Sequence, residues 1–266
     1  MYPLRQVADV LQRLAPLELA EEWDNVGLLL GSWGHPVRRV MTCLTLTAPV
    51  AQEAVEHHVQ LVVTHHPIPF RPLKRITDET PTGEVLWQLA QAGICVYSAH
   101  TAFDSAADGI NQALAAGVGL EEIEPLVLPS EPQVGSPPAG TGRRGRLVPA
   151  IPLRELVERV KGFLAVERLQ VVGPLDRRVQ QVAVVCGSGG ALLPQAIQAG
   201  CEVFLTGEMR FHDCLEAQAR GVALVLPGHY ATERFALEQL ARQLAQALPE
   251  LEVWPSRQER DPLQWV

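Results

Sequence analysis

The sequence has no long apolar run and no segment resembling a signal peptide. Its apolar runs are about five residues long, whereas a helix that crosses a membrane needs about 20 apolar residues. Residues 1–5, Met-Tyr-Pro-Leu-Arg, contain no apolar core of the kind that a signal peptide carries. We therefore expect no membrane segment and a cytoplasmic location.

Paired cysteines and an excess of basic residues are also missing. There are five cysteines, an odd number, with no Cys-x-x-Cys pair, and most stand within apolar stretches. This pattern predicts buried thiols in a reducing compartment rather than a disulfide framework. The net charge of −8 argues against broad electrostatic capture of nucleic acid. We interpret the one short basic cluster, Arg143–Arg146, as a solvated loop rather than a phosphate site.

Three common enzyme signatures are absent as well. The run Gly187-Ser-Gly-Gly190 fits neither a Walker loop nor a Gly-x-Gly-x-x-Gly dinucleotide motif. No Gly-x-Ser-x-Gly nucleophile turn stands out. Any chemistry must therefore come from other residues.

What the sequence does contain is an alternation of short apolar runs with helical patterns. Predicted strands include 40–46, 61–64, 94–97, 182–185, 203–205 and 222–226, and predicted helices include 4–14, 50–59, 85–92, 153–164, 191–199, 210–219 and 230–248. Residues Ser105–Asp108 fit a capping box before a helix that ends near Leu114. With 47% apolar and 20% charged residues, the chain is typical of a globular α/β protein with largely parallel strands.

The predicted elements occur twice in the same order, which indicates duplication of one α/β unit. Residues 126–149 are rich in proline and glycine and predict a linker or long surface loop. We therefore expect a first repeat at 1–125, joined by 222–266 to form a metal-bearing domain, and a second repeat at 150–221.

A histidine followed four residues later by a carboxylate ends each half. The pairs are His100 with Asp104 and His229 with Glu233. Residues four apart share one helix face, so each pair could approach one metal ion. Alternatively, the acids serve the helix dipole or a capped turn, and His100 orients a ligand instead of being one.

A third polar cluster, His65-His66, closes the apolar run before it. Ligands of open α/β sheets bind beyond the carboxyl ends of the strands, where all three clusters fall. Successive strand residues point to opposite faces, but at a strand end before proline both rings could face one cleft. A surface histidine pair is the alternative, although the preceding residues look buried.

Together these clusters suit a two-metal site. The predicted ligands are His65, His66, Asp104, His229 and Glu233. Histidine with carboxylate favours Zn, Fe, Mn or Co over Mg, so we expect two such divalent ions per chain. The catalytic candidates for proton transfer are His100, Glu208 and His212, while a helix N-terminus explains Glu208 and His212 equally well.

Five ordered motifs resemble the Nif-three-like dinuclear metal centre family, whose members are often labelled GTP cyclohydrolase 1 type 2 homologues. They are Glu22-Trp-Asp-Asn-Val-Gly-Leu, Thr64-His-His-Pro-Ile-Pro-Phe, Ser98-Ala-His-Thr-Ala-Phe-Asp104, Thr206-Gly-Glu and Gly228-His-Tyr-Ala-Thr-Glu233. The resemblance implies two intertwined α/β repeats with mixed, largely parallel sheets and a toroidal hexamer. It implies the same five ligands. Where the family often has two adjacent histidines, this chain has Phe211 before His212.

Two functions follow from this resemblance. The first is a metal-dependent hydrolase, similar to GTP cyclohydrolase 1 type 2, that acts on a nucleotide or another phosphate-containing small molecule. The second is a non-enzymatic metal-binding scaffold or interaction protein.

Overall fold

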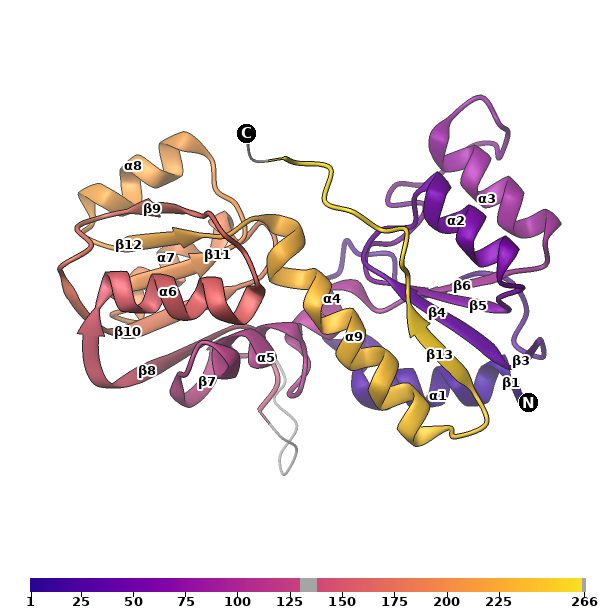
Figure 1. Ribbon diagram of the computed structural model, residues 1–266, viewed down its shortest axis with the longest axis horizontal. Coiled ribbons are helices and arrows are strands. Elements are labelled where there is room, and N and C mark those ends of the chain that lie inside the picture. The colour runs from indigo at the N-terminus through magenta and orange to yellow at the C-terminus, as the bar shows by residue number, and fades with distance from the viewer. Residues whose placement is uncertain (130–137, 265–266) are drawn as a thin grey trace. The chain divides into compact units, whose positions relative to one another are not determined.

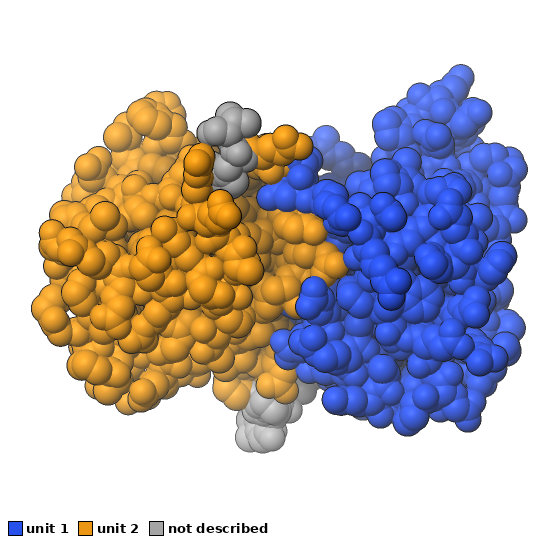
Figure 2. All heavy atoms as spheres, in the orientation of Figure 1, with its two compact units in different colours: residues 1–103, 236–262 blue, residues 104–235, 263–266 orange. Residues whose placement is uncertain are grey.

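The computed structural model describes residues 1–129 and 138–264. The chain forms two compact units, coloured separately in Figure 2. Unit 1 contains Met1–Phe103 and Ala236–Pro262, and unit 2 contains Asp104–Phe235 with the described residues Leu263 and Gln264.

These boundaries differ from the sequence prediction, which put a boundary in segment 126–149. The chain instead passes between units inside two helices, α4 (His100–Ser105) and α9 (His229–Ala247). Residues 130–137 of the predicted linker lie outside the described residues. The described residues at its two ends, 126–127 and 141–149, belong to adjacent antiparallel strands of unit 2.

Unit 1 is built on a five-stranded sheet in the order β13-β4-β5-β6-β2 (Figure 1). Its strands are β2 (Gly27–Leu30), β4 (Arg39–Cys43), β5 (Leu61–Thr64), β6 (Cys95–Ser98) and β13 (Glu252–Pro255). Strands β13, β4, β5 and β6 are parallel, and β2 is antiparallel to β6. The parallel strands therefore end at one edge of the sheet.

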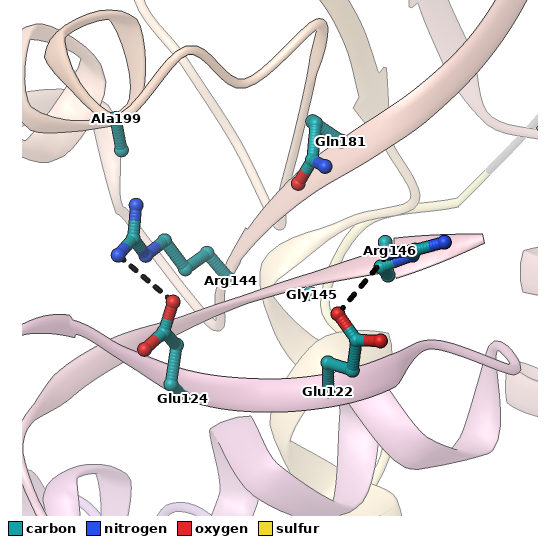
Figure 3. Close-up of a pocket in the computed structure, with 7 residues that line it drawn as sticks. All are labelled: Glu122, Glu124, Arg144, Gly145, Arg146, Gln181 and Ala199. Carbon is teal, nitrogen blue, oxygen red and sulfur yellow. Dashed lines mark hydrogen bonds and ion pairs between the residues drawn. The ribbon is translucent and has the colours of Figure 1, made fainter.

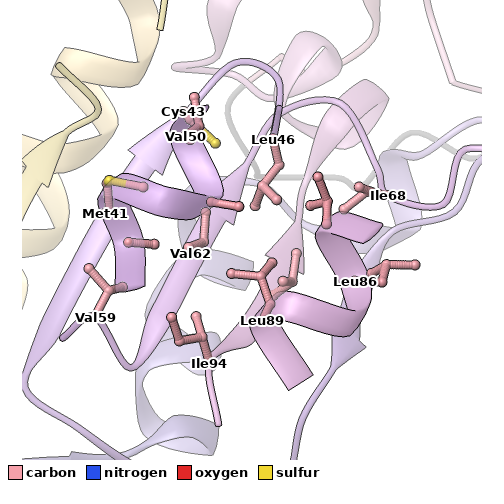
Figure 4. Packing of buried hydrophobic residues seen from close by; sticks show 14 residues of the cluster. Met41, Cys43, Leu46, Val50, Val59, Val62, Ile68, Leu86, Leu89 and Ile94 are labelled. Atoms are coloured by element: carbon pink, nitrogen blue, oxygen red, sulfur yellow. The ribbon is translucent and has the colours of Figure 1, made fainter. Parts of the chain in front are cut away.

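Helices cover both faces of this sheet. They are α1 (Leu4–Leu14), α2 (Ala48–Glu56), α3 (Pro81–Gln91) and the second half of α9, with short elements β1 (Tyr2–Pro3), β3 (Pro36–Val37) and η1 (Leu17–Leu19). Alternate strand residues such as Met41 and Val62 pack with Leu89 in the core beneath α2 and α3 (Figure 4). On the other face, the Thr42 hydroxyl donates to the carbonyl oxygen of Leu237 in α9 at 2.9 Å.

Unit 2 has a six-stranded sheet in the order β7-β8-β10-β11-β12-β9. The strands are β7 (Glu121–Val127), β8 (Thr141–Pro152), β9 (Gln170–Val172), β10 (Arg178–Val185), β11 (Val203–Thr206) and β12 (Ala223–Leu226). Only the central β10, β11 and β12 are parallel to one another. The other elements are α5 (Ile110–Gly117), α6 (Leu153–Leu164), η2 (Gly190–Leu192), α7 (Leu193–Gln198) and α8 (Phe211–Ala219).

The two units share a local detail that supports duplication. Helices α1 and α6 both begin directly after a proline, Pro3 and Pro152, each with φ −62° and ψ 144°. The first helical amide then donates to a carbonyl of the chain preceding the first parallel strand, from Leu4 at 2.8 Å and from Leu153 at 2.9 Å. The same arrangement, a proline followed by a backbone hydrogen bond, thus starts a helix in both halves.

The predicted mixed α/β class is confirmed, with parallel pairing at the centre of each sheet. The predicted capping box is wrong, because Ser105 ends α4 and the next helix begins only at Ile110. Gly109 occupies its N-cap, where no side chain caps the helix.

The predicted solvated loop at Arg143–Arg146 is also wrong, because these residues lie in β8. Alternation along the strand buries Arg143 completely while Arg144 stays partly exposed. The Arg143 guanidinium donates to the carbonyl oxygens of Gly140 at 2.6 Å and Ala106 at 2.6 Å. Burial lowers its pKa to about 10.

Two further expectations concern composition. Four of the five cysteine side chains are buried, as predicted, and Cys214 is half-buried. Among the helices within residues 1–129 and 138–264, none combines the length and apolar character that a membrane span requires.

Candidate metal centre

Unit 1 gathers three imidazoles at the carboxyl edge of its sheet, and we call His65, His66 and His100 the histidine cluster. His65 and His66 follow β5, and His100 begins α4 just after β6. The ring centroids are 5.2 Å apart for His65–His66 and for His65–His100, and 5.6 Å apart for His66–His100. One nitrogen from each ring lies within 4.8 Å of the others, so the three could serve one metal ion.

The backbone explains how consecutive histidines reach one cluster. The amides of His65 and His66 donate to the carbonyl oxygens of Cys43 at 2.9 Å and Leu44 at 2.8 Å, which holds this turn against the end of β4. The Ser98 hydroxyl donates to the carbonyl oxygen of His65 at 2.7 Å. These bonds begin beyond β5, where the strict alternation of a strand no longer applies.

Oxygen atoms orient two of the rings. Nδ1 of His66 lies 2.7 Å from the Thr45 hydroxyl, and Nδ1 of His100 lies 2.8 Å from Oδ1 of Asp24. An imidazole whose Nδ1 bonds to oxygen presents Nε2 to a metal, and a carboxylate partner strengthens it as a ligand. Burial raises the pKa of Asp24, but hydrogen bonds from His100 and Thr101 outweigh it and lower the pKa to about 2.

Unit 2 gathers acids around one histidine, and we call Asp104, Glu208, His229 and Glu233 the mixed cluster. His229 opens α9, so Glu233 lies one turn later, and its Oε2 is 3.1 Å from His229 Nε2. Oε1 of Glu208, just after β11, is 3.0 Å from His229 Nδ1. The hydrogen bond with Glu233 outweighs burial and, with the contribution of Glu208, raises the pKa of His229 to about 9.

Cys186 links the remaining acid to this cluster. Its thiol donates to Oδ1 of Asp104 at 3.2 Å. Burial raises the pKa of Cys186 well above its usual range, and the negative charges of Asp104 and Glu233 raise it further. Both carboxylates therefore act on the same protonated thiol, one from α4 and one from α9.

Gly187 leaves room for these groups. Its φ is +60°, and a Cβ at this position would lie 2.1 Å from Oε1 of Glu233 and 3.2 Å from Nε2 of His229. A side chain here would displace the carboxylate. Glycine therefore satisfies both the backbone conformation and the close approach.

Within each unit, the structure brings predicted site residues together. His65, His66 and His100 come together in unit 1, and Asp104, His229, Glu233 and Glu208 come together in unit 2. His212 is exposed in the first turn of α8, where its ring packs against Phe211 with centroids 5.7 Å apart. The described contacts do not bring it into the mixed cluster.

Sequence reasoning missed three supporting residues. Asp24 stands in a motif of acid and amide before an apolar run, and this motif was the available signal. Thr45 and Cys186 carry no such signal in the sequence. Each follows a strand, β4 or β10, and only the folded sheet brings it beside the side chain that it contacts.

A separate pocket of about 560 Å³ lies in unit 2 and contains none of these residues (Figure 3). Two cross-strand ion pairs line it, Arg144–Glu124 at 2.8 Å and Arg146–Glu122 at 3.3 Å. Because each charge already faces an opposite one, this pocket has no metal-binding character.

Comparison with known proteins places this chain in one family. The sequence model of Duf34/NIF3 (NGG1p interacting factor 3) matches residues 2–262. The "Protein NIF3 homolog" of Schizosaccharomyces pombe is 38% identical over 244 residues, covering 88% of this chain and 86% of that protein. The "GTP cyclohydrolase 1 type 2" of Helicobacter pylori is 34% identical over 239 residues, 88% of each chain. A Bacillus cereus protein related to NIF3 has the same fold, with a TM-score of 0.89 at 23% identity, over 100% of this chain and 99% of that one.

Proposed function

The chain belongs to the Duf34/NIF3 family, and we propose that it is a metal-dependent hydrolase acting on a nucleotide-like substrate. The observation that carries the proposal is the histidine cluster, three imidazoles with nitrogens within 4.8 Å of one another. The name of the Helicobacter pylori relative, GTP cyclohydrolase 1 type 2, supports the substrate class.

The donor atoms of both clusters fit divalent transition metals. Mixed imidazole and carboxylate ligands suit Zn, Fe, Mn or Co. The proposed ligands of two ions are His65 and His66 from unit 1 and Asp104, His229 and Glu233 from unit 2. Glycine at position 187, beside the Glu233 carboxylate, supports a role that needs this carboxylate in a fixed place.

The protein's own groups have distinct proposed tasks. A bound ion would supply Lewis acidity and lower the pKa of a coordinated water toward about 7. Asp24, ionised because its pKa is about 2, fixes the proton of His100 on Nδ1. Glu208 orients His229 in the same way and, together with His100, is a candidate for proton transfer. His212 is a proton-transfer candidate on its sequence position alone.

Metal analysis tests the ligand set. Purified wild-type protein should contain close to two ions per chain, the number that the two-metal geometry requires. His65→Ala and Glu233→Ala should each lower that content. His57→Ala, which removes an exposed histidine of unit 1, is the matched control. Unchanged content in either ligand variant removes that residue from the set.

Turnover tests the hydrolase. Metal-loaded protein should release formate from GTP, or product from another nucleotide or phosphodiester, and a chelator or Glu233→Ala should abolish the reaction. A fully loaded protein that turns over no hydrolysable substrate would refute the enzyme. It would support the second function, a metal-binding interaction protein, which the family description "NGG1p interacting factor 3" favours.

Two coarser properties complete the proposal. We propose a homo-hexamer, which light scattering of the purified protein tests directly. The proposed location is the cytoplasm, supported by four buried cysteines in a chain without a disulfide framework.

A further inference from the structure

Two large aromatic side chains beside the histidine cluster are exposed. Trp23 keeps 62% and Phe70 keeps 54% of its surface accessible. Their ring centroids are 6.0 Å apart, and each lies 6.0 Å from the centroid of His100. A single exposed aromatic needs no explanation, but adjacent ones beside a polar cluster mark a binding surface.

Hydrogen bonds hold the backbone on which both rings stand. Next to Trp23, Asp24 accepts from Nδ1 of His100 at 2.8 Å and from the amide of Thr101 at 3.1 Å. Asn25 then donates from its side-chain amide to the carbonyl oxygen of Pro69 at 2.9 Å, directly before Phe70. The two loops are therefore joined to each other and to the start of α4, so the exposed rings are fixed without being buried.

The ring geometry limits what can bind. Trp23 and Phe70 are tilted by 51°, and each stands nearly edge-on to His100 at 79°. A third ring between two others needs about 7 Å, two contacts of about 3.5 Å each, which exceeds the 6.0 Å between the centroids. A ligand ring must therefore stack on an outer face, and we call Trp23 and Phe70 the aromatic wall.

We propose that the aromatic wall binds a planar heteroaromatic ring of the substrate by stacking and so presents its neighbouring atoms to the histidine cluster. A flat ring with polar edges suits this place, because the wall is apolar while His100 and Asp24 border it with polar atoms. The proposal rests on the proposed function in that the ring belongs to the molecule hydrolysed. Stacking itself accepts any base, because every base has a flat aromatic face.

Exposed apolar side chains continue along the chain after the aromatic wall. Leu73 and Ile76, which follow Phe70 in the chain, are also exposed. A second copy of the chain could cover such a surface. The experiment therefore measures oligomeric mass as well as ligand affinity.

The test compares two probes that differ only in the ring. Guanosine 5′-monophosphate and ribose 5-phosphate are titrated into metal-loaded protein by calorimetry. Wild type should bind the nucleotide at least tenfold more tightly. Trp23→Leu should raise the Kd for the nucleotide about 5- to 150-fold, the usual effect of losing one stacking partner, and leave ribose 5-phosphate unaffected. Phe70→Leu should have a smaller effect in the same direction.

Two variants guard against trivial loss of structure. Trp23→Phe keeps an aromatic face and should restore most of the affinity. Trp87→Leu removes an indole of α3 that is 49% exposed and should leave both Kd values unchanged. Because the wall is exposed, the thermal midpoint of Trp23→Leu should match that of wild type.

Several results would refute the proposal that the aromatic wall binds a substrate ring. One is equal wild-type affinity for the two probes, and another is a Kd in Trp23→Leu within twofold of wild type. A loss of oligomeric mass in Trp23→Leu without any ring preference would assign the surface to a second copy.

Metal content and turnover of the same samples separate the two proposals, the aromatic wall and the hydrolase. Undiminished hydrolysis of GTP by Trp23→Leu, at concentrations below saturation, would refute the role of the aromatic wall alone. Ring-selective binding without any turnover would refute the hydrolase alone.

Discussion

After the second parallel strand, unit 1 continues as Thr64-His65-His66 and unit 2 continues as Thr206-Gly207-Glu208. Both threonine hydroxyls donate at 3.2 Å to a carbonyl of the loop after the preceding strand. The hydrogen bonding of the two threonines therefore matches, but the side chains that follow them differ. Unit 1 thereby builds its cluster from imidazoles, and unit 2 builds one from carboxylates around His229.

Helix α9 explains the difference at the first of these positions. A Cβ at Gly207 would lie 2.7 Å from the Thr232 hydroxyl and 2.8 Å from Cα of His229. The first turn of α9 already occupies the space that the side chain of His65 has in unit 1. The element that packs against a position thus determines which side chain it can carry, even where two positions of a repeat are equivalent.

A second contrast concerns buried charge. Unit 1 buries Glu53, which accepts hydrogen bonds from the Ser256 hydroxyl at 2.5 Å and the Arg257 amide at 2.9 Å. Unit 2 buries Arg143, which donates to backbone carbonyls. Each unit therefore fixes an irregular segment with one charge, an acid where amides need an acceptor and a base where carbonyls need a donor.

The largest expected effect comes from Arg143. Arg143→Met should cost about 4 kcal/mol of unfolding free energy, because several buried carbonyls lose a charged donor at once. Urea denaturation measures the change. Arg144→Met, its neighbour on β8 with an exposed ion pair to Glu124, should cost less than about 1 kcal/mol. Equal costs would show that the buried charge has no special role.

Gly207→Ala makes unit 2 resemble unit 1 by one methyl group. It should destabilise the protein by about 3 kcal/mol, since the contacts at 2.6–2.8 Å involve backbone and a packed hydroxyl. The control is Gly162→Ala in α6, where nothing lies within 4 Å, and which should stabilise by roughly 0.5–1 kcal/mol. Denaturant midpoints of both variants check the pair, and a neutral Gly207→Ala would contradict the packing argument.

Glu53→Gln tests the acid of unit 1. It should cost about 2 kcal/mol, because a neutral amide oxygen accepts the same bonds less strongly than a carboxylate. Glu56→Gln, one turn along α2 and exposed, should change stability by less than about 0.5 kcal/mol. Thermal unfolding of both variants measures the difference. A cost for Glu53→Gln no larger than that of its control would remove the second contrast.

The smallest expected effect is the pH dependence of His229 in metal-free protein. Its folded pKa, about 9, lies above the ordinary value of 6.5, so the stabilisation is complete below pH 6.5 and is lost as the pH rises through 9. Glu208→Gln should therefore lower the free energy of unfolding more at pH 6 than at pH 9.5, by at most about 1 kcal/mol for this partly exposed pair. Urea denaturation at the two pH values measures the difference. A pH-independent difference would show that Glu208 does not hold a charged imidazole.

The sequence predicted most strands and helices because apolar periodicity and buried runs are local signals. It also predicted that polar residues follow the ends of strands, as His65, His100 and Glu208 do. It failed at Arg143–Arg146, where glycine and proline nearby suggested a loop although strand pairing with β7 and β10 decides the conformation. The partners Thr45 and Cys186 were out of reach, because only the folded sheet brings them beside His66 and Asp104.

The closed space at Gly207 also bears on how such a duplicated gene evolves. Copying the codons of His65 and His66 into the second half would drive an imidazole into Thr232, so the folded product would be lost. The asymmetry between the halves, once established, is thus protected against erasure.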